Sequence, residues 1–207
     1  MPYEHRWNKL WRQFGVGEPD PGLLPLLLDR YREAHRKYHT LQHLDACLAH
    51  FDAVRGQAQH AEEVEMALWF HDAIYQVRDA SNEIQSAEWA RSALLQGQAD
   101  AQSARRVHAL VMVTNHQTEP QTPDEALLLD VDLAILGAPS AQFDAYEKQL
   151  REEFASIPEV AFRSGRRKIL TMFLHREPIY RTDWFRQRFE RQAKLNLGNS
   201  LSTLGSD

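Results

Sequence analysis

Apolar side chains recur every three or four positions along most of the chain, which is the spacing of one face of an α-helix. Trp7, Leu10, Trp11 and Phe14 follow this spacing, and Gly15 ends their segment. No stretch alternates apolar and polar residues as a half-buried strand does. The chain is therefore predicted to be all-α. The predicted helices are 7–14, 23–35, 41–55, 61–72, 82–95, a segment ending near 115, 126–136, 141–154, 159–175 and 183–197.

Two of these helices begin with a capping box, in which a polar side chain and a residue three positions later cap each other's backbone. Asn82 with Gln85 predicts one such start. Thr122 with Glu125 predicts the other, and Pro123 stands at its first helical position. Both starts follow polar loops, so these two boundaries are the best marked in the chain.

Length and composition are those of one globular domain, with 207 residues of which 43% are hydrophobic. We expect a single-domain helical bundle over residues 1–198 and a disordered polar tail over 199–207. A net charge of −5 argues against nucleic acid, and no apolar run approaches a membrane span or a signal peptide. The single cysteine, Cys47, predicts a reducing cytoplasm and a small packed side chain. A homodimer is compatible with these properties.

His71 and Asp72 stand side by side at the end of an apolar run that begins at Val64. Burying a carboxylate and an imidazole together costs several kcal/mol unless each has a charged or hydrogen-bonding partner. A divalent cation bound by both side chains would be such a partner. For the dipeptide alone, an internally hydrogen-bonded helix end is the competing interpretation.

Two further segments carry polar residues that match this chemistry. His39 and His43 are four positions apart, so on a helix they lie on one side, one turn apart. Asp130 and Asp132 interrupt a strongly apolar helix. They are about 200° apart around the helix axis, so only one of them can face a given site. A metal ion would explain one buried aspartate, and capping or a histidine contact would explain the other.

Taken together, these segments resemble the H…HD…D signature of the HD superfamily of metal-dependent phosphohydrolases. The likeness covers about residues 31–197 and is strongest to a bacterial branch known only as predicted HD phosphohydrolases. Position by position it implies four metal ligands, His43, His71, Asp72 and Asp132. Asp132 is preferred to Asp130 because residues 132–135 resemble the last-ligand segment of cyclic nucleotide phosphodiesterases. In those enzymes the histidine four positions before the first ligand is a general acid, which corresponds to His39 here.

The chemistry expected from this ligand set is metal-dependent hydrolysis of a small phosphate ester, with a nucleotide as the expected substrate. Two imidazoles and two carboxylates suit Mn²⁺, Fe²⁺, Co²⁺, Ni²⁺ or Zn²⁺ better than Mg²⁺ alone, with one ion per site. The ion would activate water, and an acid would protonate the leaving oxygen. His43 and His71 must be neutral to bind metal, so activity is expected to fall below about pH 6.5.

Four more residues are secondary candidates. Glu83, at a helix start, resembles an acidic residue that lies over the metal in some HD enzymes, and is a catalytic candidate beside His39. His116 resembles an additional histidine of binuclear members and is placed with the substrate-binding candidates. Arg36 and Lys37 precede the site and could hold a substrate phosphate. The competing interpretations are a helix-dipole partner for Glu83 and a solvated helix end for the two basic residues.

Two other functions remain open from the sequence. One is an HD module that senses a nucleotide without turnover. The other is a di-iron oxygenase of the myo-inositol oxygenase type, which needs a fuller set of histidines than this chain places near the motif.

Overall fold

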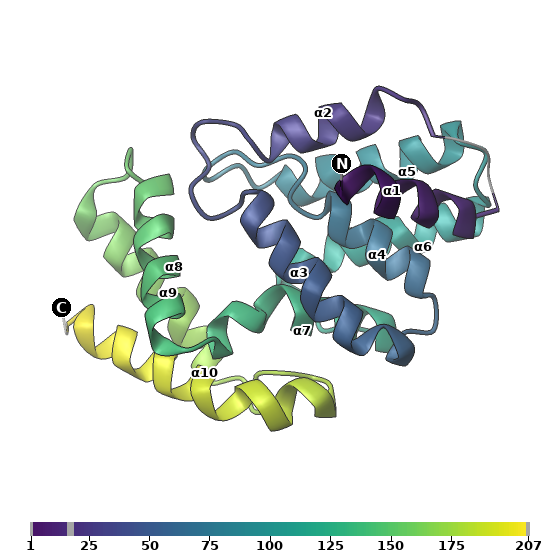
Figure 1. Cartoon of the computed structure of the whole chain (residues 1–207). Helices are drawn as coiled ribbons and strands as arrows, with labels where there is room; N and C mark the ends of the chain where they lie inside the picture. The colour runs from purple at the N-terminus through teal and green to yellow at the C-terminus, as the bar shows by residue number, and fades with distance from the viewer. Residues whose placement is uncertain (1, 16–18, 206–207) are drawn as a thin grey trace. The chain divides into compact units, whose positions relative to one another are not determined.

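The computed structural model describes residues 2–15 and 19–205. Among these residues every regular element is a helix and none is a strand, which confirms the all-α prediction (Figure 1). Within the same residues no single helix is both long and apolar enough to cross a membrane, although the bent pair 123–137 and 140–153 passes that test in combination. The α-helices are α1 Pro2–Gln13, α2 Leu23–Arg30, α3 Leu41–Val54, α4 Ala61–Phe70, α5 Asn82–Gln96, α6 Ala101–Met112, α7 Pro123–Asp132, α8 Ser140–Glu153, α9 Glu159–Leu174 and α10 Asp183–Thr203; the 3-10 helices are η1 Arg55–Gln57, η2 Val113–Asn115 and η3 Leu133–Gly137.

The chain divides into two compact units, Met1–Leu128 and Leu129–Asp207, where the sequence predicts one bundle. In the first unit α4 is the central element, and α1, α3, α5 and α6 pack around it (Figure 1). All eight residues from Glu63 to Phe70 are buried. This central position explains why α4 is mostly apolar, and its two buried carboxylates, Glu63 and Glu65, are paired with arginines.

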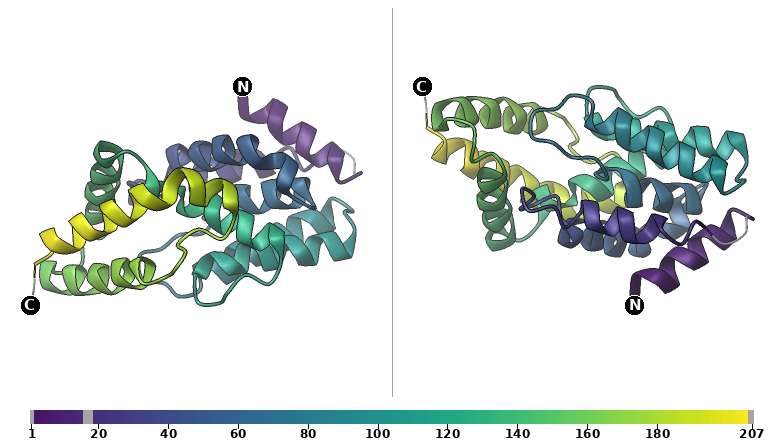
Figure 2. Two further views of the ribbon diagram at one scale, coloured as in Figure 1. Left: turned by 90° about the horizontal axis from the view of Figure 1, so that it is seen from below. Right: turned by 90° about the horizontal axis from the view of Figure 1, so that it is seen from above.

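The second unit has its own core, in which α10 packs against η3, α8 and α9 (Figure 2). Gly137 permits the close approach of α10, because a Cβ there would lie 2.6 Å from the backbone oxygen of Phe189. The amide of Asn196 then donates to the carbonyls of Leu136 and Ala138, at 2.9 and 2.8 Å. A glycine and a buried amide therefore fix α10 against η3.

Two helix ends differ from the sequence prediction. The second helix ends at Arg30 and not at 35, and residues 31–40 form turns that lead to α3. The last helix continues through Gly198 to Thr203, so the first part of the predicted tail is helical, and residues 206–207 lie outside the described chain. The continuation has a cause in the neighbouring helix, since the guanidinium groups of Arg163 and Arg167 donate to the carbonyl of Leu204.

The two predicted capping boxes have different outcomes. Thr122 Oγ1 accepts from the backbone N–H of Glu125 at 3.2 Å, which is half of the predicted capping box. The Glu125 carboxylate accepts instead from the backbone N–H of Gln121. Asn82, however, does not cap α5, because its amide exchanges two hydrogen bonds with the backbone of Gln76 and so closes the preceding loop. Ser81 holds the N-cap position, and the Gln85 amide donates to its hydroxyl at 2.6 Å. The helix prediction is right here, but the role of Asn82 is wrong.

Candidate metal centre

The end of α4 presents His71 and Asp72. The helix ends at Phe70, so the two residues follow its last turn instead of lying within it. His71 Nδ1 donates to the carbonyl of Leu68, one of the free carbonyls of this helix end, at 2.8 Å. With the proton on Nδ1, the ring directs an unprotonated Nε2 away from the helix. This is the tautomer that a metal-binding histidine requires.

The start of α3 presents His43. Thr40 is the N-cap, in an extended conformation, and its side chain accepts from the N–H of Gln42. His39 therefore lies in the turn before the helix, and the prediction that His39 and His43 share one helix face is wrong. The rings nevertheless lie near each other, with centroids 6.0 Å apart, because the capping turn folds back over the first turn of α3.

Three donor atoms from these segments form a small triangle. His43 Nε2 and His71 Nε2 are 3.0 Å apart. Asp72 Oδ2 lies 3.1 Å from His71 Nε2 and 3.4 Å from His43 Nε2. Both imidazoles are buried, while 18% of the surface of the Asp72 side chain is exposed. The three residues that the sequence assigns to a metal within this unit therefore do come together, with one open side at the carboxylate.

The partners of Asp72 differ from those of the other buried carboxylates of this unit. Glu63 binds the guanidinium of Arg106 through two hydrogen bonds of 2.7 and 2.6 Å. Glu65 binds two arginines, and Asp124 accepts from two backbone N–H groups. Asp72 Oδ2 is buried among two imidazole nitrogens and makes no hydrogen bond with acceptable geometry. A cation is what this cluster lacks, because buried carboxylates are otherwise paired.

The electrostatics of Asp72 agree with this view. Burial by itself would raise the pKa of the carboxyl group. The His71, His39 and His43 imidazoles outweigh that effect and hold the pKa of Asp72 well below its usual range. Asp72 is therefore an anion at neutral pH, and its charge attracts a cation to this cluster.

The spacing of the triangle fits a divalent ion. Two ligands about 2.1 Å from one ion are about 3.0 Å apart at a right angle and about 3.4 Å apart at a tetrahedral angle. The three measured separations, 3.0, 3.1 and 3.4 Å, cover this range. Two imidazoles and one carboxylate on one side of an ion suit Mn²⁺, Fe²⁺, Co²⁺, Ni²⁺ or Zn²⁺. The residues present therefore fit such an ion.

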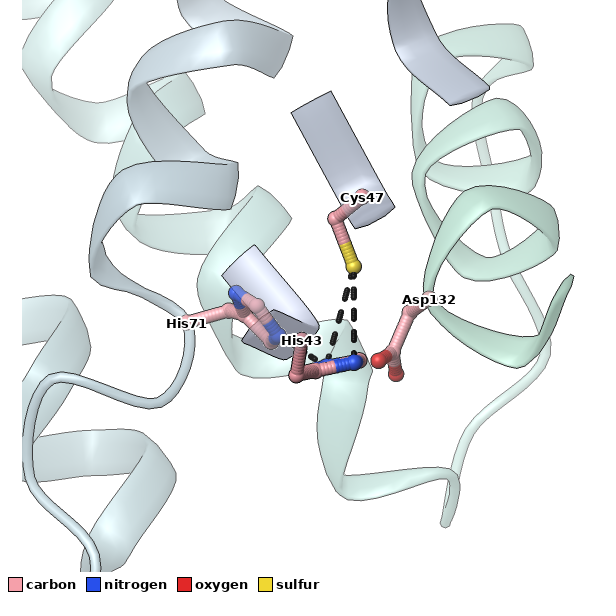
Figure 3. Close-up of side chains that lie close together, drawn as sticks. All are labelled: His43, Cys47, His71 and Asp132. Atoms are coloured by element: carbon pink, nitrogen blue, oxygen red, sulfur yellow. Dashed lines mark hydrogen bonds between the residues drawn. The ribbon is translucent and has the colours of Figure 1, made fainter. Parts of the chain in front are cut away.

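Cys47 also lies at this cluster, and the donor atoms of His43, Cys47 and His71 are within 4.8 Å of one another (Figure 3). Its sulfur is 3.6 Å from His43 Nε2 and 3.8 Å from His43 Nδ1. Near-equal distances place the sulfur over the face of the ring and not beyond Nε2, where a shared ion would lie. Cys47 therefore packs against the imidazole, in line with the small packed residue predicted from sequence.

An aromatic wall adjoins the triangle. The His39 ring stacks on Tyr75, with centroids 4.2 Å apart and planes 27° apart, and its other neighbour is Tyr38 at 5.0 Å. Tyr38 in turn lies 4.8 Å from the ring of His43. The stacking on Tyr75 holds the His39 ring beside that of His43. The sequence does not mark Tyr75, because it lies in a loop without periodicity.

Glu83 lies close enough to Asp72 and His116 for their charges to act on its carboxyl group. Glu83 is in the first turn of that helix and is half-buried. Burial raises the pKa of Glu83, the charge of Asp72 raises it further, and His116 opposes the shift. His116 has a left-handed backbone, with φ at 55°, just after η2. A carboxyl group with a raised pKa near the triangle is suited to proton transfer.

The two basic residues expected to hold a phosphate are placed differently. The side chain of Arg36 is fully buried. Its guanidinium donates to the carbonyls of His39, Asp72 and Ala73. Lys37 is exposed, and its ammonium group donates to the carbonyl of Ala34 at 3.0 Å. The burial of Arg36 argues against direct contact between its guanidinium and a substrate.

Asp130 and Asp132 belong to the second unit and have different environments. Asp130 is buried and accepts from the backbone N–H groups of Arg181 and Thr182 and from the Thr182 hydroxyl, at 2.6–2.8 Å. It therefore anchors the start of α10. Asp132, also drawn in Figure 3, is the last residue of α7 and is partly exposed. The capping alternative raised by the sequence thus belongs to Asp130.

No protein-family model, curated protein or solved structure matches the chain. The fold and the site nevertheless define a class: an all-α protein in which one imidazole from α3 and an imidazole and a carboxylate that follow the central helix α4 form a candidate divalent-metal centre.

Proposed function

We propose that the protein is a metal-dependent phosphohydrolase of the HD type that cleaves a phosphate ester of a small molecule, with a nucleotide as the proposed substrate. The observation that supports this most directly is the triangle of His43 Nε2, His71 Nε2 and Asp72 Oδ2, with its buried and otherwise unpaired carboxylate oxygen. Two imidazoles and one carboxylate leave coordination positions free for water and substrate oxygens. A divalent ion held there supplies Lewis acidity and a water of lowered pKa.

Asp132 is proposed as the fourth ligand for two reasons, its sequence pattern and the hydrogen bonds that already occupy Asp130. Three hydrogen bonds to the start of α10 occupy the Asp130 carboxylate. A carboxylate so engaged would have to give up these donors in order to bind an ion. Of the two aspartates in this apolar helix, Asp132 is therefore the better ligand.

His39 and Glu83 are proposed as the groups that move protons. The His39 ring is held by Tyr75 and lies next to His43, so it can donate a proton to a leaving oxygen beside the triangle. Glu83, with its raised pKa, can orient a water or share that task. His116 lies close enough to influence the Glu83 carboxyl group and is retained as a substrate-binding candidate.

The function is tested by hydrolysis of a panel of phosphate esters, including nucleoside mono-, di- and triphosphates, by metal-free protein reconstituted with each divalent ion. We expect turnover that requires a transition metal and that disappears with chelator. Tight nucleotide binding without turnover would instead support the sensing module. Oxygen consumption with two irons bound per chain would support the oxygenase.

We expect His39→Gln to lower kcat by about 10²–10⁴-fold on esters with poor leaving groups, since a general acid contributes that much. An ester of nitrophenol needs little protonation of its leaving group, so its hydrolysis should fall far less. The measurement is kcat for two or more esters whose leaving groups differ in pKa. Because a structural role for His39 would slow every ester equally, an equal loss on all esters contradicts the assignment.

His35→Gln is the matched control for His39. His35 lies in the same turn region, and its Nε2 contacts the carbonyl of Tyr75 at 2.9 Å. The substitution perturbs the same loop but removes no group next to His43. We expect no dependence of its effect on the leaving group.

A further inference from the structure

Arg36 connects the turn that leads into α3, the helix of His43, with the turn that carries His71 and Asp72. The first segment contains His39, and the second follows the end of α4. The Arg36 Nη1 donates to the carbonyl of His39 at 3.2 Å and to that of Asp72 at 2.6 Å. Nη2 donates to the carbonyl of Ala73 at 3.1 Å. One side chain thus holds the backbones of both segments.

The surroundings of the guanidinium keep it in this position. Its carbon lies 5.3 Å from the ring centre of Tyr31 and 5.5 Å from that of Tyr75, within the range of cation–π contacts. Nε donates to the Glu33 carboxylate at 3.1 Å. Two of the three carbonyls that it binds, those of Asp72 and Ala73, follow the C-terminal end of α4, where the helix dipole favours a positive charge. Water and substrate have no access to a side chain that is fully buried in this way.

We propose that Arg36 is a positioning residue that sets the separation of His43, His71 and Asp72 by tying the turn before α3 to the end of α4. The inference rests on the proposed metal centre but not on hydrolysis. A planar guanidinium directs several N–H groups at several carbonyls at once. An ammonium group has the same charge without this geometry, so lysine cannot replace the contacts.

The test is the dissociation constant for Mn²⁺, measured by electron paramagnetic resonance on metal-free wild type, Arg36→Lys and Arg36→Ala, with circular dichroism to verify folding at the working temperature. We expect the Mn²⁺ Kd to rise by about 10–100-fold in Arg36→Lys, as for other residues that orient metal ligands. Guanidinium ion at millimolar concentration should restore Mn²⁺ affinity in Arg36→Ala by binding between the two tyrosine rings. Equal concentrations of sodium ion should not.

Arg106→Lys is the matched control. Arg106 also binds α4, through two hydrogen bonds to the Glu63 carboxylate. Neither bond involves a residue of the triangle. Its substitution should lower stability and leave the Mn²⁺ Kd unchanged. The inference is overturned if folded Arg36→Lys binds Mn²⁺ as tightly as wild type, or if both lysine variants weaken binding equally. If wild type itself binds no Mn²⁺, the metal centre fails and this inference fails with it.

Discussion

Asp72→Ala is expected to lower metal-dependent hydrolysis by at least about 10³-fold and to remove tight Mn²⁺ binding. The carboxylate is the one anionic group in the triangle, and it supplies the edge that is open to solvent. A metal ion contributes several kcal/mol to a phosphoryl-transfer transition state, and each 1.36 kcal/mol is tenfold in rate. Loss of the ion at working concentrations therefore removes most of the activity. The measurements are kcat/KM with saturating metal and the Mn²⁺ Kd.

Asp79→Ala serves as the control for Asp72. Asp79 lies seven positions later, in the loop before α5, and its carboxylate is fully exposed and accepts from Ser81. We expect wild-type activity and Mn²⁺ affinity in this variant. If Asp72→Ala keeps its Mn²⁺ affinity, the triangle does not hold the ion, whatever happens to turnover.

The second prediction with a large expected effect distinguishes the stabilising role of Asp130 from the proposed ligand role of Asp132. Asp130→Asn is expected to lower the free energy of unfolding by about 1–3 kcal/mol, because an amide has one acceptor oxygen where the carboxylate has two, and at least one of the buried donors at the start of α10 then loses its partner. Burial raises the pKa of Asp130 to about 6, so between about pH 4 and 6 the folded chain holds a proton that the unfolded chain has released. The contribution of this group to stability therefore falls as pH rises through that window and is constant above it. Urea unfolding of wild type and variant at several pH values measures both effects.

Asp132→Asn should give the opposite result. Unfolding should stay close to wild type, because Asp132 is partly exposed, while the Mn²⁺ Kd and kcat should both deteriorate by an order of magnitude or more. Circular dichroism in urea and Mn²⁺ titration on the same samples decide the assignment. A stable protein with weak metal binding after Asp130→Asn, and an unstable one after Asp132→Asn, would exchange the two roles.

The fold was predictable where apolar periodicity and capping agree. The buried run before His71 marks α4 correctly from Ala61, because a central helix needs mostly apolar residues. Gly198 was predicted to follow the end of the last helix, but α10 continues beyond it. Arg163 and Arg167 stabilise the longer helix by donating to the carbonyl that follows it. The division into two units was also not evident, because both cores are built from the same apolar residue types.

The candidate metal ligands could be predicted from the sequence, but the residues that hold them in place could not. His71 and Asp72 are recognisable because they follow an apolar run, whereas His43 is implied as a ligand by the resemblance to the HD signature. The position of His39 was missed because an N-cap threonine interrupts the helical register between the histidines. The role of Arg36 depends on contacts with residues 36 and 37 positions later, which no local pattern records.

The most direct test of the central claim is the anomalous difference map of a crystal grown from Mn²⁺-loaded protein. The account predicts one peak within about 2.3 Å of His43 Nε2, His71 Nε2 and Asp72 Oδ2. A peak bound by other residues, or well-ordered side chains with no peak between them, would contradict it.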